Sequence, residues 1–259
     1  MSMSIARRCR RFLRALVVIL ALVWTTAPAS AQDASDSGWE FYATVYGWLP
    51  GLELSTHAQG PVPPTSVDMS ISDVIQSLDL AVQGAFEARN DRLIGLIDVN
   101  YFSLSDDESL GGILFTKASV ETSGVIASAN LGYRLVEADP VVFDVFAGVQ
   151  VASMKTELGL AGMMPVSRSD SQTLVDPLIS ARAFVDLGSG FFVGAAGSIG
   201  GFGVDSDLTW QVIGQVGWQA NDWLTLRAGY RHQEFNLDGS HLIDNMTMSG
   251  PILGATFRL

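Results

Sequence analysis

The chain is short of cysteine, of charge and of basic residues. It holds one Cys in 259 residues, which excludes a disulfide framework and a Cys-rich metal cluster. Charged residues make up 16% of the chain, and 27 Asp and Glu outnumber 15 Lys and Arg. The small charged fraction argues against disorder, which needs high charge and low hydrophobicity. The acidic balance argues against nucleic acid as a partner, because nucleic-acid-binding surfaces are basic.

Apolar runs long enough for a transmembrane helix are also lacking. An uninterrupted apolar run of ten residues, 15–24, follows several Arg and precedes small residues that end in Ala-Ser-Ala at Ala31. A transmembrane helix needs about 20 apolar residues, whereas this order is typical of a secretory signal peptide. We therefore expect residues 1–31 to be a cleaved signal peptide and residues 32–259 to form one exported domain. That domain is either soluble outside the inner membrane or crosses a membrane as strands.

Apolar and polar residues alternate with a period of two along most of the chain from Trp39 onwards, which is the pattern of a half-buried β-strand. No long helical pattern is found, and Ser72 to Leu78 predicts one short turn of helix with Ser72 as its cap. The alternation predicts ten strands, near residues 39–49, 80–89, 92–104, 118–136, 141–156, 175–187, 191–199, 208–219, 223–235 and 246–259.

The predicted connections alternate between short and long. The tight turns are 90–91, 137–140, 188–190 and 220–222, and the longer loops are 50–79, 105–117, 157–174, 200–207 and 236–245. With up-and-down connectivity, all short turns meet at one end of the sheet and all long loops at the other. Short periplasmic turns, long extracellular loops and an even strand number are typical of outer-membrane barrels. We predict an all-β fold, a transmembrane up-and-down antiparallel β-barrel of ten strands, with eight as the alternative count.

The two faces of the predicted strands differ in charge. One face is free of charge through the middle of each strand, as hydrocarbon requires, because a charge at the bilayer midplane costs roughly 2–4 kcal/mol. Aromatic residues gather at the short-turn end of this face and predict a periplasmic-side girdle, formed by Trp39, Tyr133, Phe143, Phe191, Trp218 and Phe257. The other face carries both signs and predicts a paired network in the lumen, formed by Glu87, Arg89, Asp98, Arg134, Asp144, Asp176, Arg182, Asp186, Arg227, Arg231 and Arg258.

Short motifs are spread over nearly the whole chain after the signal segment. They are Trp48-Leu49-Pro50-Gly51, Gly84-Ala85-Phe86-Glu87-Ala88-Arg89, Gly200-Gly201-Phe202-Gly203, Ser206-Asp207-Leu208-Thr209-Trp210-Gln211, Gly229-Tyr230-Arg231 and a C-terminal set of Gly250, Pro251, Gly254 and Phe257. In this combination they resemble a widespread but poorly characterised family of Gram-negative outer-membrane β-barrel proteins. The resemblance implies a barrel fold and an outer-membrane location, and it brings no catalytic or ligand-binding residues.

The expected function depends on the lumen. About eight strands leave an interior that side chains just fill, and 16–18 leave an aqueous channel, so ten strands predict a largely filled lumen. The leading hypothesis is a structural or surface-interaction scaffold that holds extracellular loops. The alternative is a narrow channel for small solutes, lined by Arg227, Arg231, Arg182 and Asp98. A wide general porin is not supported.

An enzyme is not expected from the sequence. His232 and Glu234 approach the rim, but they have the parity of the lipid-facing side, and no Gly-x-Ser-x-Gly elbow is present. A rim hydrolase that depends on His232 is kept as the third hypothesis. The run Asp106-Asp107-Glu108 lacks the alternating ligands and Gly of a calcium loop, so neither a metal nor another cofactor is expected. The expected partners are outer-membrane lipid and lipopolysaccharide, with the barrel-assembly machinery during insertion, and we expect a monomer.

Overall fold

The computed structural model describes residues 38–56, 65–109, 115–162, 166–237 and 243–259. The chain divides into two compact units, Met1–Trp39 and Glu40–Leu259. The predicted signal peptide falls outside the described residues, and the fold described below is that of the second unit. No helix in these described ranges has the length and the hydropathy needed to cross a membrane.

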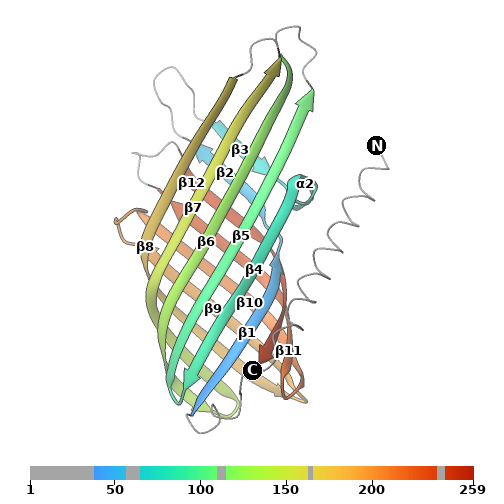
Figure 1. Ribbon diagram of the computed structural model, residues 1–259. Coiled ribbons are helices and arrows are strands. Elements are labelled where there is room, and N and C mark those ends of the chain that lie inside the picture. Colours follow the sequence, from blue (N-terminus) through green and yellow to red (C-terminus); the bar gives the residue numbers. More distant parts are fainter. Residues whose placement is uncertain (1–37, 57–64, 110–114, 163–165, 238–242) are drawn as a thin grey trace. The chain divides into compact units, whose positions relative to one another are not determined.

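The second unit is a closed antiparallel β-barrel of ten strands (Figure 1). The strands form one 12-stranded sheet, in which the pairing of β1 with β12 closes the ring, while β2 and β3 add a hairpin to the upper part of β12. The predicted fold class and strand count are therefore confirmed. The elements are β1 (Trp39–Trp48), β2 (Gly51–Thr56), β3 (Thr65–Met69), α2 (Ile71–Ser77), β4 (Leu78–Asn90), β5 (Leu93–Ser109), β6 (Phe115–Ala138), β7 (Val141–Gly162), β8 (Val166–Gly188), β9 (Phe191–Gly201), β10 (Leu208–Asn221), β11 (Leu224–Asn236) and β12 (Ile243–Arg258).

The first strand of the barrel is interrupted near Pro50 and then continues along the same partner. β1 pairs with the lower part of β12, up to Trp48 opposite Ile252, and β2 pairs with the upper part, from Gly51 opposite Ser249. At the break, the Leu49 N–H still donates to the Pro251 carbonyl at 3.1 Å. A proline has no N–H to give to a ladder, which explains why the regular pairing stops at this point.

At one end of the barrel, all four predicted tight turns are confirmed, at residues 91–92, 139–140, 189–190 and 222–223. We call this the short-turn end and the opposite end the extended end. The predicted loops 105–117 and 157–174 are wrong, because most of these residues belong to β5, β6, β7 and β8. These stretches are rich in Ser, Thr and charged residues at both parities, so alternation cannot identify strands whose two faces both contact water.

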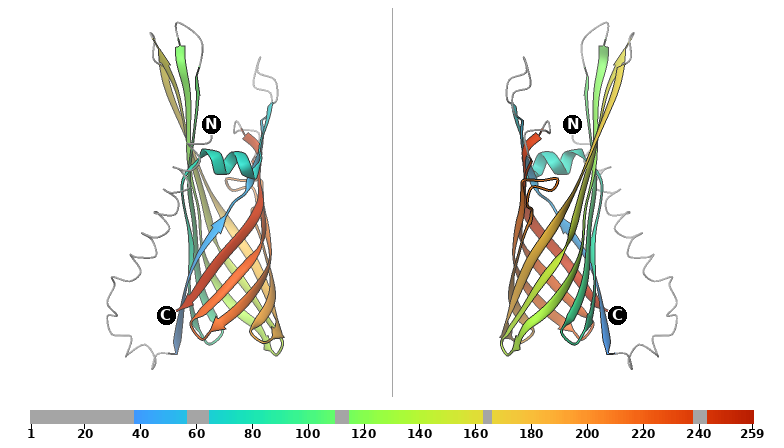
Figure 2. Two further views of the ribbon diagram at one scale, coloured as in Figure 1. Left: turned by 90° about the vertical axis from the view of Figure 1, so that its right-hand side faces the viewer. Right: turned by 90° about the vertical axis from the view of Figure 1, so that its left-hand side faces the viewer.

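The extended parts of β5–β8 rise above their neighbours as a free-standing sheet (Figure 2). β4 follows β5 only as far as the pair Leu78–Leu104, and β9 follows β8 only as far as Gly200 opposite Leu178. Beyond these pairs, β5 continues to Ser109 and β8 begins twelve positions earlier in the sequence, at Val166. One side of the barrel mouth is therefore much taller than the other.

The predicted first loop, 50–79, is also wrong, since it contains β2, β3 and α2. α2 is the expected short helix, but its cap is Ser70 rather than Ser72. The Ser70 hydroxyl accepts a hydrogen bond from the Asp73 N–H at 3.3 Å, and the Asp73 carboxylate accepts one from the Ser70 N–H at 3.0 Å. This reciprocal arrangement is a capping box, and it places Ser72 inside the helix.

Each of the ten barrel strands exposes at least one large apolar side chain on its outer face: Val45, Val82, Ile97, Leu131, Val149, Ile179, Ile199, Val216, Leu226 and Leu253. The inner positions of the same strands hold most of the buried polar residues, such as Asn100, Asp144 and Gln233. A soluble barrel has the opposite polarity, whereas a barrel in a bilayer presents apolar side chains outwards and polar side chains inwards. The outer wall is therefore built to contact hydrocarbon.

Candidate functional site: the layered lumen

A charged layer crosses the lumen near the short-turn end, with Arg182 at its centre. The Arg182 guanidinium donates to both Glu87 carboxylate oxygens at 2.6 and 2.9 Å and, through Nε, to Asp144 at 2.9 Å. Arg134 Nε donates to the other oxygen of Asp144 at 2.9 Å, and Arg89 bonds to Glu87. Forked pairing of this kind is the strongest that arginine makes with carboxylates, so the layer ties β4, β6, β7 and β8 together.

Aromatic rings complete this charged layer. The Arg182 guanidinium lies 4.9 Å from the ring centre of Phe146. Arg227 lies 5.6 Å from the ring centre of Phe184 and 5.5 Å from that of Phe192. Arg227 Nε is buried without a hydrogen-bond partner among the described residues. Arg227 is therefore held mainly by the negative faces of two rings, which differs from the carboxylate pairing that the sequence predicts.

A second layer, which we call the polar layer, lies further along the strands toward the extended end. The Tyr46 hydroxyl is within hydrogen-bond distance of an Asp98 oxygen at 2.7 Å and of Asn100 Oδ1 at 3.0 Å, and the Asn100 amide donates to Asp98 at 2.8 Å. Arg231 Nη1 is 3.9 Å from Asp98, and its Nη2 donates to Gln233 at 3.0 Å. These contacts join β1, β5 and β11 across the barrel.

A cavity of about 130 Å³ lies between these two layers. Four of the residues that line it have a buried polar atom with no partner in the described structure: Asn130 Oδ1, Gln150 Nε2, Gln211 Oε1 and Arg231 Nε. One water occupies about 30 Å³ in the liquid, so the cavity has room for about four. Its unpaired donors and acceptors make it suitable for water or for a small polar solute.

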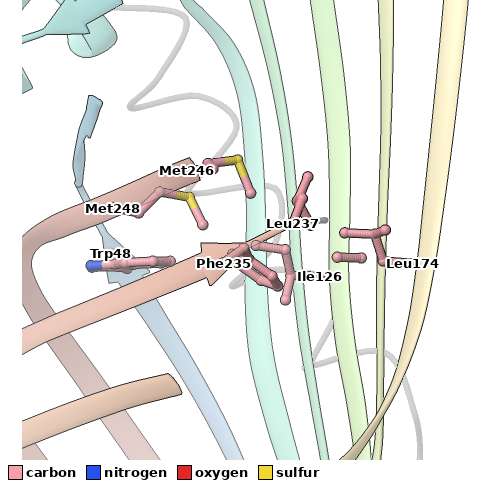
Figure 3. Packing of buried hydrophobic residues seen from close by; sticks show 8 residues of the cluster. Trp48, Ile126, Leu174, Phe235, Leu237, Met246 and Met248 are labelled. Carbon is pink, nitrogen blue, oxygen red and sulfur yellow. The ribbon is translucent and has the colours of Figure 1, made fainter. Parts of the chain in front are cut away.

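An apolar cluster lies in the lumen on the extended side of the polar layer. Figure 3 shows its side chains pointing toward one another from opposite walls of the barrel. The cluster consists of Trp48, Ile126, Ala152, Leu174, Phe235, Leu237, Met246 and Met248. Phe235 is completely buried at its centre, and the Trp48 ring carries the Arg231 guanidinium 4.4 Å from its own centre. Apolar burial of about 1.5–3 kcal/mol per side chain thus stabilises this apolar layer.

The structure distributes the predicted lumen residues over several sites. Glu87, Arg89, Arg134, Asp144 and Arg182 meet in the charged layer, and Asp98 and Arg231 lie in the second layer. Arg227 also lies in the charged layer, against aromatic rings, and the three other predicted members join neither layer.

Three predicted members of the network have other partners. Asp176 is buried and accepts hydrogen bonds from the N–H and hydroxyl of Ser206 at 2.9 and 2.7 Å, so it anchors the connection between β9 and β10. Asp186 is exposed and accepts from the Gly188 N–H at 2.7 Å within a tight turn. Arg258 is 53% exposed at its side chain and pairs with Glu40 at 2.6 Å. For these residues the prediction of a lumen network is corrected.

The aromatic residues predicted as a girdle all lie on outward positions near the short-turn end. The side chains of Trp39, Tyr133, Phe191 and Trp218 are exposed, and those of Phe143 and Phe257 are half-buried. Phe191 stacks on Trp218 with ring centres 6.1 Å apart, and Phe257 stacks in the same way on Trp223. Trp223 is not among the residues predicted for the girdle. Its aromatic ring and its place in the last tight turn would have indicated that it belongs there.

The apolar cluster is the feature that sequence reasoning missed. Its members occupy lumen-facing positions, where the alternation of the sequence draws attention mainly to charged side chains. A signal was present, since lumen positions near the extended ends are apolar at Ile126, Leu174, Met246 and Met248.

Among the described residues, no three His, Cys, Asp or Glu side chains are grouped so that they could hold a metal ion.

Comparisons with known proteins agree with this architecture. No protein-family model matches the chain, and no curated protein is significantly similar to it. The outer membrane protease OmpT from Escherichia coli superposes with a TM-score of 0.52 at 9% sequence identity, covering 91% of this chain and 100% of that one. This is the fold of an outer-membrane β-barrel. The apolar outer wall and the closed fold together place the chain in the outer membrane.

Other solved barrels superpose less well. The translocator domain of the autotransporter NalP from Neisseria meningitidis covers 99% of this chain and 98% of its own, at a TM-score of 0.46 and 12% identity. The attachment invasion locus protein Ail of Yersinia pestis covers 86% and 99%, at a TM-score of 0.39 and 10% identity. At these identities the likeness concerns the fold alone.

Proposed function

We propose that this protein is a non-conducting scaffold of the outer membrane, which presents the extended parts of β5–β8 and the β2–β3 hairpin at the cell surface. Short turns face the periplasm in barrels of this kind, so the extended end faces outwards. The observation that carries the proposal is the apolar cluster around Phe235, which crosses the lumen between opposite walls. The charged layer around Arg182 adds a second closure toward the short-turn end.

An apolar constriction opposes ion flow because water leaves it and an ion would lose its hydration there. In the charged layer, Glu87 and Asp144 are each paired with two arginines, so neither carboxylate is free to bind a passing cation. The surface role is supported by the free-standing sheet and its two edge strands. Within the described residues, β5 has no strand partner on its β4 side beyond Leu104, and β8 has none on its β9 side before Leu178. Unpaired strand edges are templates for added strands.

Single-channel recording in planar bilayers tests this proposal. The unaltered protein should give no discrete conductance steps. A double variant, Phe235→Ala with Met246→Ala, removes the centre of the apolar cluster and should produce steps. The matched control is Phe191→Ala, which removes an outward-facing ring and should remain silent. Steady steps from the unaltered protein would contradict a closed lumen.

The second candidate is a narrow channel for small solutes, and the polar cavity favours it. Asp98 and Arg231 both line that cavity, and the buried unpaired atoms around them could take over the hydration of a solute. If the unaltered protein conducts, Arg231→Ala should change the ion selectivity of the steps, because it removes the positive charge of the polar layer. An unchanged selectivity would exclude this route.

A further inference from the structure

The outer wall of β11 and β12 carries a group of polar side chains near the extended end. His232 and Glu234 on β11, and Asn245, Thr247 and Ser249 on β12, occupy outward positions near the extended end. The inward positions between them hold Gln233, Phe235, Met246 and Met248, which are buried in the lumen. The polar set is therefore outside the barrel and is separate from every layer of the lumen.

Four of these side chains form an ordered sequence of contacts. His232 and Ser249 are direct cross-strand partners, and the imidazole Nδ1 lies 2.6 Å from the Ser249 hydroxyl oxygen. The imidazole Nε2 lies 3.9 Å from a carboxylate oxygen of Glu234. The other carboxylate oxygen of Glu234 accepts a hydrogen bond from the Asn245 amide at 2.8 Å. The Trp210 ring, with its centre 4.7 Å from that of the imidazole, limits how the imidazole can turn.

We propose that Ser249, His232 and Glu234 act as nucleophile, general base and orienting acid of a hydrolase that cleaves acyl esters of membrane lipids. A hydroxyl, an imidazole and a carboxylate in this order are the parts of a serine hydrolase, and such sets are recognised by geometry and role rather than by position in the sequence. A proton on Nε2, facing Glu234, leaves the Nδ1 lone pair toward Ser249. Contacts of this type are often long before substrate binds.

A groove of about 680 Å³ begins at the proposed nucleophile. Ser249, Thr247 and Tyr230 line one part of it, and Glu53, Ile71 and Ile75 line another. Tyr230 is 54% exposed and Ile75 is 50% exposed. The groove therefore combines an apolar surface with hydroxyl and carboxylate groups. Such a lining fits the junction between a polar headgroup and an acyl chain, which is where a lipid carries its ester.

The wall below the groove explains how a lipid would reach it. Leu253 on β12 is 65% exposed, and Leu226 on β11 is exposed as well, so the strands that carry Ser249 and His232 continue directly into the hydrocarbon-facing belt. A lipid of the same leaflet could therefore present its ester to Ser249 without leaving the membrane. Tyr230 also brings a phenolic donor of the kind that stabilises an oxyanion.

The reaction needs only water as a co-reactant. The Ser249 oxygen attacks the acyl carbon while His232 takes the hydroxyl proton, and the proton then passes to the alcohol oxygen as the ester bond to it breaks. A water molecule, deprotonated by His232, attacks the acyl-serine, and the proton returns to the Ser249 oxygen as the fatty acid leaves. Glu234 stabilises the imidazolium that forms in each step. Ester and water thus give fatty acid and alcohol.

Labelling with a fluorophosphonate tests the site without requiring the natural lipid. The folded, detergent-solubilised protein should gain one probe adduct, and peptide mapping should place it on Ser249. Ser249→Ala should lose the adduct, and His232→Ala should slow labelling by about 10²–10⁴-fold, as expected for loss of a general base. The control is Ser153→Ala, because Ser153 is also an outward hydroxyl in a cross-strand pair, with Thr173 at 2.9 Å. This control should label at the rate of the unaltered protein.

Release of fatty acid identifies the source of the ester. One assay uses mixed micelles of phosphatidylethanolamine and the other uses purified lipopolysaccharide. The lipid from which fatty acid is released faster is the preferred substrate. Glu234→Gln should lower the rate of fatty-acid release while the barrel remains folded, because it removes the carboxylate that orients the His232 imidazole. Each variant is checked for the shift of its gel band on boiling. A folded protein that neither labels at Ser249 nor releases fatty acid from either lipid would overturn the proposal. The conductance experiments on the lumen do not affect this result.

Discussion

Arg182 holds both carboxylate oxygens of Glu87, at 2.6 and 2.9 Å, although the two residues are 95 positions apart in the chain. The same guanidinium also reaches Asp144, whose side chain is fully buried. One side chain on β8 therefore connects β4 with β7 through the lumen. The barrel wall is held together by its backbone ladder, and this arginine adds a link across the interior.

Removal of Arg182 should destabilise the barrel strongly. Arg182→Ala leaves Glu87 without its forked partner and removes one of the two arginines on Asp144, and breaking a buried pair in this way costs about 3–5 kcal/mol. Arg258→Ala is the control, because Arg258 forms an exposed pair with Glu40 that should contribute at most about 1 kcal/mol. Urea titration followed by the loss of the folded gel band measures both. Equal shifts for the two variants would show that the charged layer does not stabilise the fold.

Truncation at the centre of the apolar cluster should also be costly. Phe235→Ala leaves a hole among Trp48, Ile126 and Met248, and large-to-small changes of this type cost about 3–5 kcal/mol. Phe235→Leu keeps most of the volume and should cost less than half as much. Thermal unfolding in detergent, followed by circular dichroism, separates the two. If both variants melt with the unaltered protein, the cluster is not well packed.

Gly250 should not tolerate a side chain. A Cβ at this position would lie 2.1 Å from the Leu49 carbonyl oxygen, which is backbone and cannot move aside easily. Gly250→Ala should destabilise the barrel by about 1–3 kcal/mol, as overpacking does. Gly214→Ala is the control, because nothing lies within 4 Å of a Cβ there. A normal yield of folded Gly250→Ala protein would show that the break between β1 and β2 is looser than the structure indicates.

A charged residue introduced on the outer wall tests directly whether hydrocarbon surrounds that wall. Leu253 is exposed on β12, and Leu253→Arg should cost about 2–4 kcal/mol if hydrocarbon surrounds it. Leu187 is also exposed but lies beside a tight turn at the short-turn end, where Leu187→Arg should cost about 0–1 kcal/mol. Folding yields into lipid vesicles, measured across a urea series, report the difference. A surface in water would tolerate both arginines equally.

The period of two was enough to predict the ten strands, but Asp186 and Arg258, which the alternation assigns to the lumen, are exposed. Glu87, Asp144 and Arg182 point inwards because their parity is fixed once a single strand is assigned. The upper parts of β5–β8 could not be predicted in this way, because both faces there carry polar residues and no alternation results. The helix α2 was expected one or two residues later than it lies, since Ser70 and Ser72 are both plausible caps and only the reciprocal contact with Asp73 distinguishes them.

Contacts between strands depend on register, which sequence periodicity does not give. Ser249 and His232 are 17 positions apart, and their pairing follows from where β12 begins after the connection from β11. A shift of two residues would keep every parity and would separate the two side chains. For the same reason, the sequence indicated that Asp176 faces inwards but not that it binds Ser206.

The rim of the barrel has unequal height around the barrel axis. β9 ends at Gly201 and β10 begins at Leu208, whereas β6 and β7 continue far above that level. A large molecule that approaches from the side of β9 and β10 meets a low rim, while one that approaches from the side of β6 and β7 meets the tall free-standing sheet. Approach to the extended end of the barrel is therefore easier from one side, and the rotation of the barrel within the membrane plane affects which side a partner meets.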